Sequence, residues 1–128
     1  MNILAGRFKG QNIRTSAKAS YRPTTSRVRK SIFDILGDLE GCSVLDLFAG
    51  SGILGFEAAS RGAAAVTFVD NDRRNVQLIH VNSQILQDQV DMKVVCKEWF
   101  RYLRVRYEYD IIFADPPYGT IVIAKLFE

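Results

Sequence analysis

From residue 43 onward, apolar runs of five to seven residues alternate with longer segments in which apolar residues recur at helical spacing. We expect strands over 43–49, 65–70, 92–96 and 109–115, and helices over 51–61, 72–86, 98–104 and 120–128. In the helix over 72–86, Leu78, Val81 and Ile85 are expected to face inward. Such alternation predicts an α/β fold with a mostly parallel sheet covered by helices on both faces. Ligands then bind beyond the carboxyl ends of the strands.

The first 37 residues follow a different pattern. Residues 2–14 are short and extended around two glycines, which indicates a basic β-hairpin or a pair of strands. Residues 24–26 offer N-caps for a helix over 27–36 that Gly37 closes. The expected apolar stripe of this helix consists of Val28, Ile32, Ile35 and Leu36, and the opposite face carries Arg27, Arg29 and Lys30. We therefore expect a small N-terminal extension, 1–37, and an α/β core, 38–128.

Composition narrows the class of protein. The chain has 128 residues, of which 48% are hydrophobic and 24% charged, as in ordinary globular domains. No stretch approaches the roughly 20 apolar residues of a membrane span. The first ten residues lack an apolar core of signal-peptide length, so we expect no secretion. Two cysteines, Cys42 and Cys96, cannot form a disulfide framework, and no Cys/His cluster has zinc spacing. We expect a cytoplasmic protein with no metal and no membrane association.

Charge is distributed unevenly along the chain. Residues 1–36 contain eight basic residues and one acidic residue, a net charge of +7, so the remaining residues carry −4 of the overall +3. Such asymmetry favours contact between the N-terminal part and a polyanion. A solvated basic surface without a partner is the alternative.

A glycine-rich segment lies between the first predicted strand of the core and the following helix. Residues 50–55 match G-x-G-x-x-G, and Asp70 follows 20 residues after Gly50 at the end of the next strand. In nucleoside-cofactor sites the glycines let the backbone approach the ligand, and the acid accepts hydrogen bonds from ribose hydroxyls. A tight turn without a ligand is the alternative.

Asp46 distinguishes between cofactors. A carboxylate inside the strand would repel the pyrophosphate of a dinucleotide. It would attract the α-amino and sulfonium cations of S-adenosylmethionine, while the loop amides meet the methionine carboxylate. Capping or turn formation is the alternative for Asp46, and a helix N-terminal role is the alternative for Asn71 and Glu98. The predicted cofactor-binding residues are Asp46, Phe48, Ala49, Gly50, Ser51, Gly52, Asp70, Asn71 and Glu98.

The sequence Asp-Pro-Pro-Tyr, 115–118, directly follows the last predicted strand. Two prolines make a stiff loop with outward carbonyls. Asp115 and the Pro116 carbonyl can accept hydrogen bonds from an exocyclic amine of a base, and Tyr118 can stack on that base. The predicted catalytic residues are therefore Asp115, Pro116 and Tyr118. A rigid turn with a packed tyrosine is the alternative.

Four segments together resemble one family: AGRFKG (5–10), RPTTSRVRKSIF (22–33), VLDLFAGSG (44–52) and DPPY (115–118). They are similar to the RsmD family of bacterial 16S rRNA guanine-N2 methyltransferases, from residue 3 to the C-terminus. The resemblance implies a Rossmann-like class I methyltransferase sheet. It also implies methyl transfer from S-adenosylmethionine, with S-adenosylhomocysteine as product, to the exocyclic N2 amine of a guanine in small-subunit rRNA.

The resemblance further implies cofactor contacts on the glycine loop, on Asp70 and on Glu98, where the family more often has aspartate. It assigns RNA binding to the basic N-terminal segment, for which we select Arg7, Lys9, Arg22, Thr24, Arg27, Arg29 and Lys30. The expected partner is 16S rRNA within the small ribosomal subunit, and we expect a monomer.

The sequence stops soon after the fourth predicted strand, so we expect a truncated product or fragment that lacks the last strands of the class I sheet, with 109–115 at the sheet edge. Two other functions remain open. One is adenine-N6 methylation of DNA or RNA, which uses the same DPPY chemistry, and the other is a non-catalytic remnant that binds RNA or cofactor. An NAD-binding domain is disfavoured by Asp46.

Overall fold

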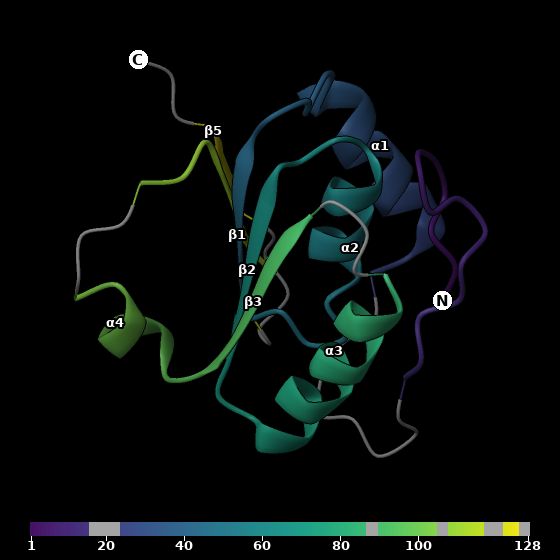
Figure 1. Cartoon of the computed structure of the whole chain (residues 1–128). Coiled ribbons are helices and arrows are strands. Elements are labelled where there is room, and N and C mark those ends of the chain that lie inside the picture. Colours follow the sequence, from purple (N-terminus) through teal and green to yellow (C-terminus); the bar gives the residue numbers. More distant parts are fainter. Residues whose placement is uncertain (16–23, 87–89, 105–107, 117–121, 126–128) are drawn as a thin grey trace.

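The computed structural model describes residues 1–15, 24–86, 90–104, 108–116 and 122–125 (Figure 1). Five strands form one sheet in the order β3-β2-β1-β4-β5. Their bounds are β1 Ser43–Leu47, β2 Ala65–Asp70, β3 Asp91–Cys96, β4 Ile111–Ala114 and β5 Val122–Lys125. Strands β1 to β4 are mutually parallel, and β5 is antiparallel to β4. The predicted α/β fold with a mostly parallel, Rossmann-like sheet is confirmed.

The strand order reverses at β1, which pairs with β2 on one side and β4 on the other. In an open parallel sheet the loops on either side of such a reversal diverge and leave a crevice at the carboxyl ends. Asp46 of β1 lies in register with Phe68 of β2 and Phe113 of β4. The chain therefore places this acid at the centre of the sheet, next to the crevice.

Four helices accompany the sheet: α1 Ser26–Leu36, α2 Ile53–Ser60, α3 Arg73–Ile85 and α4 Trp99–Tyr102. Helices α1, α2 and α3 lie on one face, together with the N-terminal residues, and α4 lies on the other (Figure 1). Thr25 caps α1, because its side chain accepts a hydrogen bond from the Val28 amide, and Asp72 caps α3 in the same way through the Arg74 amide. None of the described helices has the length and apolar character needed to cross a bilayer.

The helix expected over 120–128 is wrong for residues 122–125, which form strand β5, while the rest of that range lies outside the described residues. Ile123 pairs with Phe113 and Ala124 with Ile112. Without β5, strand β4 would present an unpaired row of backbone groups on the side away from β1, and the β-branched Val122 and Ile123 suit pairing there. The expectation that β4 forms the sheet edge is wrong for the same reason.

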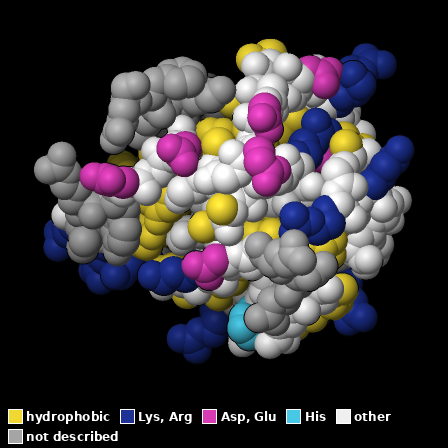
Figure 2. Space-filling view, turned by 45° about the horizontal axis from the view of Figure 1, so that its top comes forward, with side chains coloured by type: hydrophobic (Ala, Val, Ile, Leu, Met, Phe, Trp, Pro, Cys, Tyr) yellow, Lys and Arg dark blue, Asp and Glu magenta, His cyan; other side chains and the backbone are white. Residues whose placement is uncertain are grey.

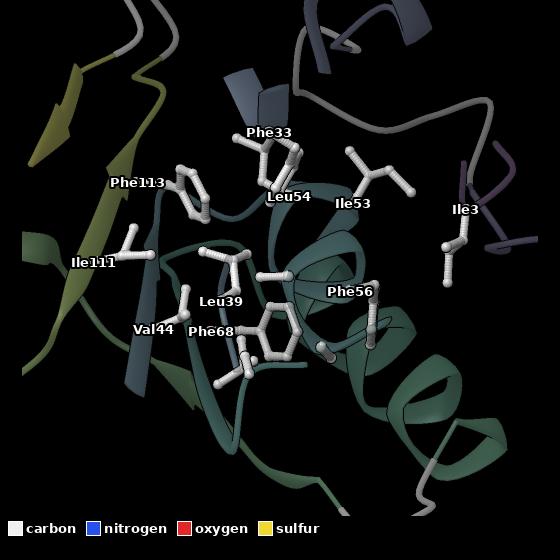
Figure 3. Packing of buried hydrophobic residues seen from close by; sticks show 14 of the residues in the cluster. Ile3, Phe33, Leu39, Val44, Ile53, Leu54, Phe56, Phe68, Ile111 and Phe113 are labelled. Carbon is white, nitrogen blue, oxygen red and sulfur yellow. The ribbon is translucent and has the colours of Figure 1, made fainter. Parts of the chain in front are cut away.

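A single hydrophobic cluster joins the N-terminal segment to the sheet (Figure 3). Ile3 and Ile13 are buried in it, and Phe33 of α1 packs on Phe113 of β4 with 5.6 Å between ring centroids. Residues 1–37 and 38–128 therefore share one hydrophobic core. Their division into an RNA-binding extension and a methyltransferase core stays a prediction.

The predicted N-terminal hairpin is present in reduced form. Asn2 and Asn12 make an isolated antiparallel bridge, and the Ile3 amide donates to the Gln11 carbonyl at 3.0 Å. The loop between them is held to α2, since the Arg7 amide donates to the Ser60 carbonyl at 2.8 Å. These backbone bonds fix the path of the basic segment across the helices.

Two helices turn different side chains inward from those expected. In α1, Ile35 is 85% exposed and Val28 40% exposed, whereas Arg29 is buried, at 2% exposure. In α3, Val81 and Ile85 are also exposed, and the buried residues are Asn75, Ile79, Asn82 and Ser83. The N-terminal segment is the cause in both helices: Arg29 donates to the Asn2 carbonyl and Asn82 pairs with the Arg14 backbone, so polar side chains are needed where the segment crosses.

Candidate active site

The loop between β1 and α2 has the backbone shape that its glycines predict. Gly50 and Gly52 have φ values of 58° and 82°, and Phe48 is also left-handed, at 59°. A Cβ at Gly52 would lie 2.8 Å from Cε2 of Phe56. At Gly55 a Cβ would lie 2.3 Å from Cε1 of Phe68, so this glycine allows α2 to pack closely on β2. The three glycines thus bring the start of α2 against the sheet.

Asp46 is buried beneath this loop, at 2% exposure, and its Oδ2 accepts a hydrogen bond from the Gly55 amide at 3.0 Å. Gly52, the N-cap residue of α2, has no side chain that could accept from the first amides of the helix. Asp46 of β1 instead accepts from the third of these amides, that of Gly55. The capping alternative for Asp46 is thus present in the structure. It places the carboxyl group near the carboxyl end of β1, beside the start of α2.

Burial raises the pKa of Asp46 well above its usual range. The Gly55 hydrogen bond opposes this shift, and the carboxylates of Asp70 and Asp115 add to it. A cation in the crevice would relieve both the desolvation and the repulsion among the three acids. The three carboxyl groups at this point therefore suit a positively charged group and disfavour a phosphate.

Asp70, at the end of β2, binds the backbone of the same glycine loop. Its Oδ2 accepts from the Gly50 amide at 2.9 Å, and its Oδ1 accepts from the Asp72 amide at 2.8 Å and from Nδ2 of Asn75 at 3.3 Å. These bonds fix the carboxylate at the end of β2. Since a carboxylate has about four acceptor positions, the described donors leave room for a further hydroxyl.

A shallow hollow, open to solvent, lies beside Asp70 at the ends of β2 and β3. Its lining consists of Phe48, Val69, Asp70, Asn71, Lys97, Glu98 and Trp99. The Asn71 side chain donates to Glu98 Oε1 at 3.1 Å, and the rings of Phe48 and Trp99 lie 6.2 Å apart. Flat apolar walls with a few polar groups suit a nucleoside.

Trp99 lines the hollow but is not among the predicted cofactor-binding residues. Tyr102 does cover the sheet and is 2% exposed, but Trp99 and Phe100 are each 46% exposed. The usable signal was the position of Trp99 directly after Glu98, at the end of β3. Because Trp99 follows Glu98 directly, both side chains line the same hollow.

Asp115 follows β4 and lies half-buried across the sheet switch point from the glycine loop. Its Oδ2 accepts a hydrogen bond from Oγ1 of Thr24 at 3.2 Å. Pro116 is buried, and Tyr118 lies outside the described residues. Thr24 was expected at the RNA surface, but it is buried, at 7% exposure, and contacts the DPPY segment instead.

Four of the predicted RNA-binding residues are exposed: Arg7, Lys9, Arg27 and Lys30. Lys30 also pairs with Asp34 at 2.7 Å, and Arg22 lies outside the described residues. Figure 2 shows acidic side chains in a band across the upper part of one face, with basic side chains mostly to its right and below. Acidic and basic side chains also adjoin one another at the borders of the band, so the separation of charge on this face is incomplete.

Arg29 does not belong to that exposed set, and its expected position on the polar face of α1 is wrong. Its Nη1 lies 3.4 Å from Glu57 Oε1 and 2.9 Å from the Asn2 carbonyl, and its Nη2 lies 3.2 Å from Ser26 Oγ. Burial lowers the pKa of Arg29, which Glu57 counteracts and Arg61 reinforces. Because Glu57 is itself buried, the guanidinium is drawn inward to compensate its charge.

The family described as "Conserved hypothetical protein 95" matches residues 1–128. The Bacillus subtilis protein named "Putative rRNA methyltransferase YlbH" is 38% identical over 123 residues, which cover 92% of this chain and 67% of that protein. The Escherichia coli K12 protein named "Ribosomal RNA small subunit methyltransferase D" is 34% identical over 120 residues, which cover 92% of this chain and 60% of that protein. The chain thus spans about two thirds of the length of these relatives.

Solved structures agree with these relatives. The structure described as "Putative methyltransferase yhhF from Escherichia coli" has a TM-score of 0.82 and 32% identity, with 91% of this chain and 64% of that one covered. The structure described as "SMU.776, a putative methyltransferase complexed with SAH" has a TM-score of 0.59 and 32% identity, with 71% and 25% covered. With its class I methyltransferase fold, the chain belongs to the family of the small-subunit rRNA methyltransferase D proteins, the RsmD family.

Proposed function

We propose that this chain transfers a methyl group from S-adenosylmethionine to the exocyclic N2 amine of a guanine in 16S rRNA. The observation that supports this most is the meeting of three acids at one edge of the sheet: Asp46 under the glycine loop, Asp70 at the end of β2 and Asp115 at the end of β4. Two of them suit a cationic nucleoside cofactor. The third, Asp115, would accept a hydrogen bond from the amine that attacks the methyl group.

When bound, S-adenosylmethionine would supply an electrophilic methyl group. Asp46 would compensate the positive charge of the methionine part, and the amides of Gly50, Ser51 and Gly52, with Ala49, would line its carboxylate. Asp70 would accept from a ribose hydroxyl. Phe48, Asn71 and Glu98 would hold the adenine in the hollow, with Trp99 as its outer wall.

At the reacting amine, the residues of this chain act by orientation and by charge. Asp115 and the carbonyl of Pro116 would accept hydrogen bonds from the two N–H groups, which draws the nitrogen lone pair out of conjugation with the base. Tyr118 would stack on the base, which must leave its helix or stack to reach the site. Holding the nitrogen in line with the methyl group would lower the barrier by orientation, and the acceptors at the amine would lower it by charge.

The substrate would be bound by the exposed basic side chains Arg7, Lys9, Arg27 and Lys30, with Arg22 of the segment between them. Phosphate contacts of this kind give affinity and orientation, not sequence recognition. We propose that the substrate is presented within the small ribosomal subunit, in the cytoplasm, and that the protein acts as a monomer. The names of the Bacillus subtilis and Escherichia coli relatives support an rRNA substrate.

The direct experiment is transfer of radiolabelled methyl from S-adenosylmethionine to unmethylated small ribosomal subunits, to naked 16S rRNA and to DNA in parallel. We expect label in the subunits or their RNA, recovered as N2-methylguanine on nucleoside digestion. Label in DNA or in N6-methyladenine would replace the proposal with the adenine-directed reaction. Binding of S-adenosylhomocysteine by folded chain without any transfer would replace it with a non-catalytic binding role.

A further inference from the structure

Thr24 and Asp115 are 91 positions apart in the sequence but share a hydrogen bond, with 3.2 Å between Thr24 Oγ1 and Asp115 Oδ2. Thr24 is buried, at 7% exposure, and belongs to the basic N-terminal extension rather than to the sheet. A buried hydroxyl in this segment has no access to RNA phosphates. Its contact is with the carboxyl group to which we assign the reacting amine.

The position of Thr24 is fixed by the elements on either side of the contact. Thr25, the next residue, caps α1: its side chain accepts from the Val28 amide at 3.2 Å and its carbonyl accepts from the Arg29 amide at 3.0 Å. Helix α1 packs on β4 through Phe33 and Phe113. The helix that follows Thr24 and the strand that precedes Asp115 are thus in direct contact, which holds the backbones of the two residues close to one another.

A carboxylate at the end of a strand rotates about its Cβ–Cγ bond unless a donor holds one of its oxygens. A donor at Oδ2 restricts that rotation, so the carboxylate meets a ligand in one orientation. Alignment of this kind matters to the rate, because a displacement of about 1 Å from the reactive geometry can cost about a hundredfold.

We propose that Thr24 is a positioning residue for Asp115, so that the N-terminal extension forms part of the catalytic centre as well as the RNA surface. The proposal rests on the proposed function, since it concerns the orientation of the carboxylate that would hold the amine. It replaces the sequence-based assignment of Thr24 to RNA binding.

The test compares Thr24→Val, which keeps the shape and removes the hydroxyl, with Thr24→Ser, which keeps the hydroxyl. In methyl transfer to small subunits, Thr24→Val should lower kcat between about ten- and a hundredfold while KM for the RNA and for S-adenosylmethionine stays within about twofold of the original. Thr24→Ser, which still has a hydroxyl donor, should retain most of the original kcat. A raised KM for RNA with unchanged kcat, or equal rates for all three proteins, would overturn the proposal.

A second measurement does not depend on turnover. Unfolding in urea gives the stability of Thr24→Val, of Asp115→Ala and of the double variant. If the two side chains interact, the double variant should lose less stability than the sum of the two single losses. Additive losses would show that the two side chains do not interact and would overturn the proposal even in a chain without activity. Absence of transfer by the unaltered chain, together with a non-additive cycle, would instead count against the proposed function alone.

Discussion

Arg29 and Glu57 form an ion pair inside the protein, with side-chain exposures of 2% and 0% and 3.4 Å between Nη1 and Oε1. Glu57 also accepts from the amides of Leu4 and Ala5, at 2.9 and 3.2 Å. Arg29 donates in turn to the carbonyl of Asn2. One buried pair, contributed by α1 and α2, therefore holds the start of the basic segment in place.

Glu57→Gln should destabilise the protein by about 3–5 kcal/mol, because it leaves two arginines facing a neutral group inside the protein. The second of these is Arg61, whose Nε lies 2.9 Å from Glu57 Oε2. The free energy of unfolding in urea measures the loss.

The matched control is Asp34→Asn, which removes the exposed partner of Lys30 on α1. The side chains of Lys30 and Asp34 are 70% and 57% exposed, so the loss of stability should be below about 0.5 kcal/mol. Similar losses for Glu57→Gln and Asp34→Asn would mean that the buried pair does not anchor the N-terminal segment.

The parallel strands and the glycine loop could be predicted because their signals are local. Four apolar runs gave β1 to β4 within two residues at each end, and the spacing of Gly50, Gly52 and Gly55 placed the loop between β1 and α2. Asp70 followed from the same spacing. These features depend on neighbours in the sequence, which a single chain displays directly.

The inward faces of α1 and α3 could not be predicted in the same way. Periodicity assigns a polar residue such as Arg29 or Asn82 to solvent unless its partner is known, and the partners lie 28 and 68 positions away. The Thr24–Asp115 contact spans a still greater distance in sequence. Strand β5 was missed because its pairing depends on the edge of β4, not on its own pattern.

Asp46 should make stability depend on pH. Its pKa is raised in the folded protein, mainly by burial, so the protonated carboxyl favours folding. This contribution is complete below the unfolded pKa of about 3.9 and is lost as pH rises through the folded pKa. Asp46→Asn cannot titrate and keeps an oxygen for the Gly55 amide, so the variant should gain stability relative to the unaltered protein across that range. Unfolding in urea at a series of pH values measures the difference.

If the free energies of unfolding of the two proteins change with pH in parallel, folding does not shift the pKa of Asp46. The same variant should bind S-adenosylmethionine at least about tenfold more weakly, because a charged hydrogen-bond partner of the cation is lost. Isothermal titration calorimetry measures this. Unchanged affinity would leave Asp46 with its capping role on α2 alone.

Asp115→Asn should lower methyl transfer by about two to three orders of magnitude, because it weakens the acceptor for the amine without touching the cofactor hollow. Affinity for S-adenosylhomocysteine should stay within about twofold. Single-turnover transfer and calorimetry separate the two quantities. The control is Glu108→Gln, an exposed carboxylate ahead of β4, which should change neither. A loss of cofactor affinity in Asp115→Asn would contradict the role assigned to it.

RNA binding should depend on Arg27 and not on Arg29, although the two are two positions apart on α1. Arg27 is exposed and Arg29 is buried against Glu57. Arg27→Glu should weaken binding and reduce the slope of log affinity against log salt by about 1, since a phosphate contact releases about one counterion. Fluorescence anisotropy with a 16S rRNA fragment over a salt series measures both.

Lys93→Glu on β3 serves as the matched control for that reversal, because Lys93 is also exposed but belongs to a strand away from the N-terminal segment. Its salt slope should equal that of the unaltered chain. Arg29→Met should lower the free energy of unfolding and leave the affinity of the folded fraction unchanged, which separates its structural role from contact with RNA. Equal slopes for Arg27→Glu and Lys93→Glu would mean that α1 lies outside the RNA interface, and binding would then have to be sought at Arg7 and Lys9.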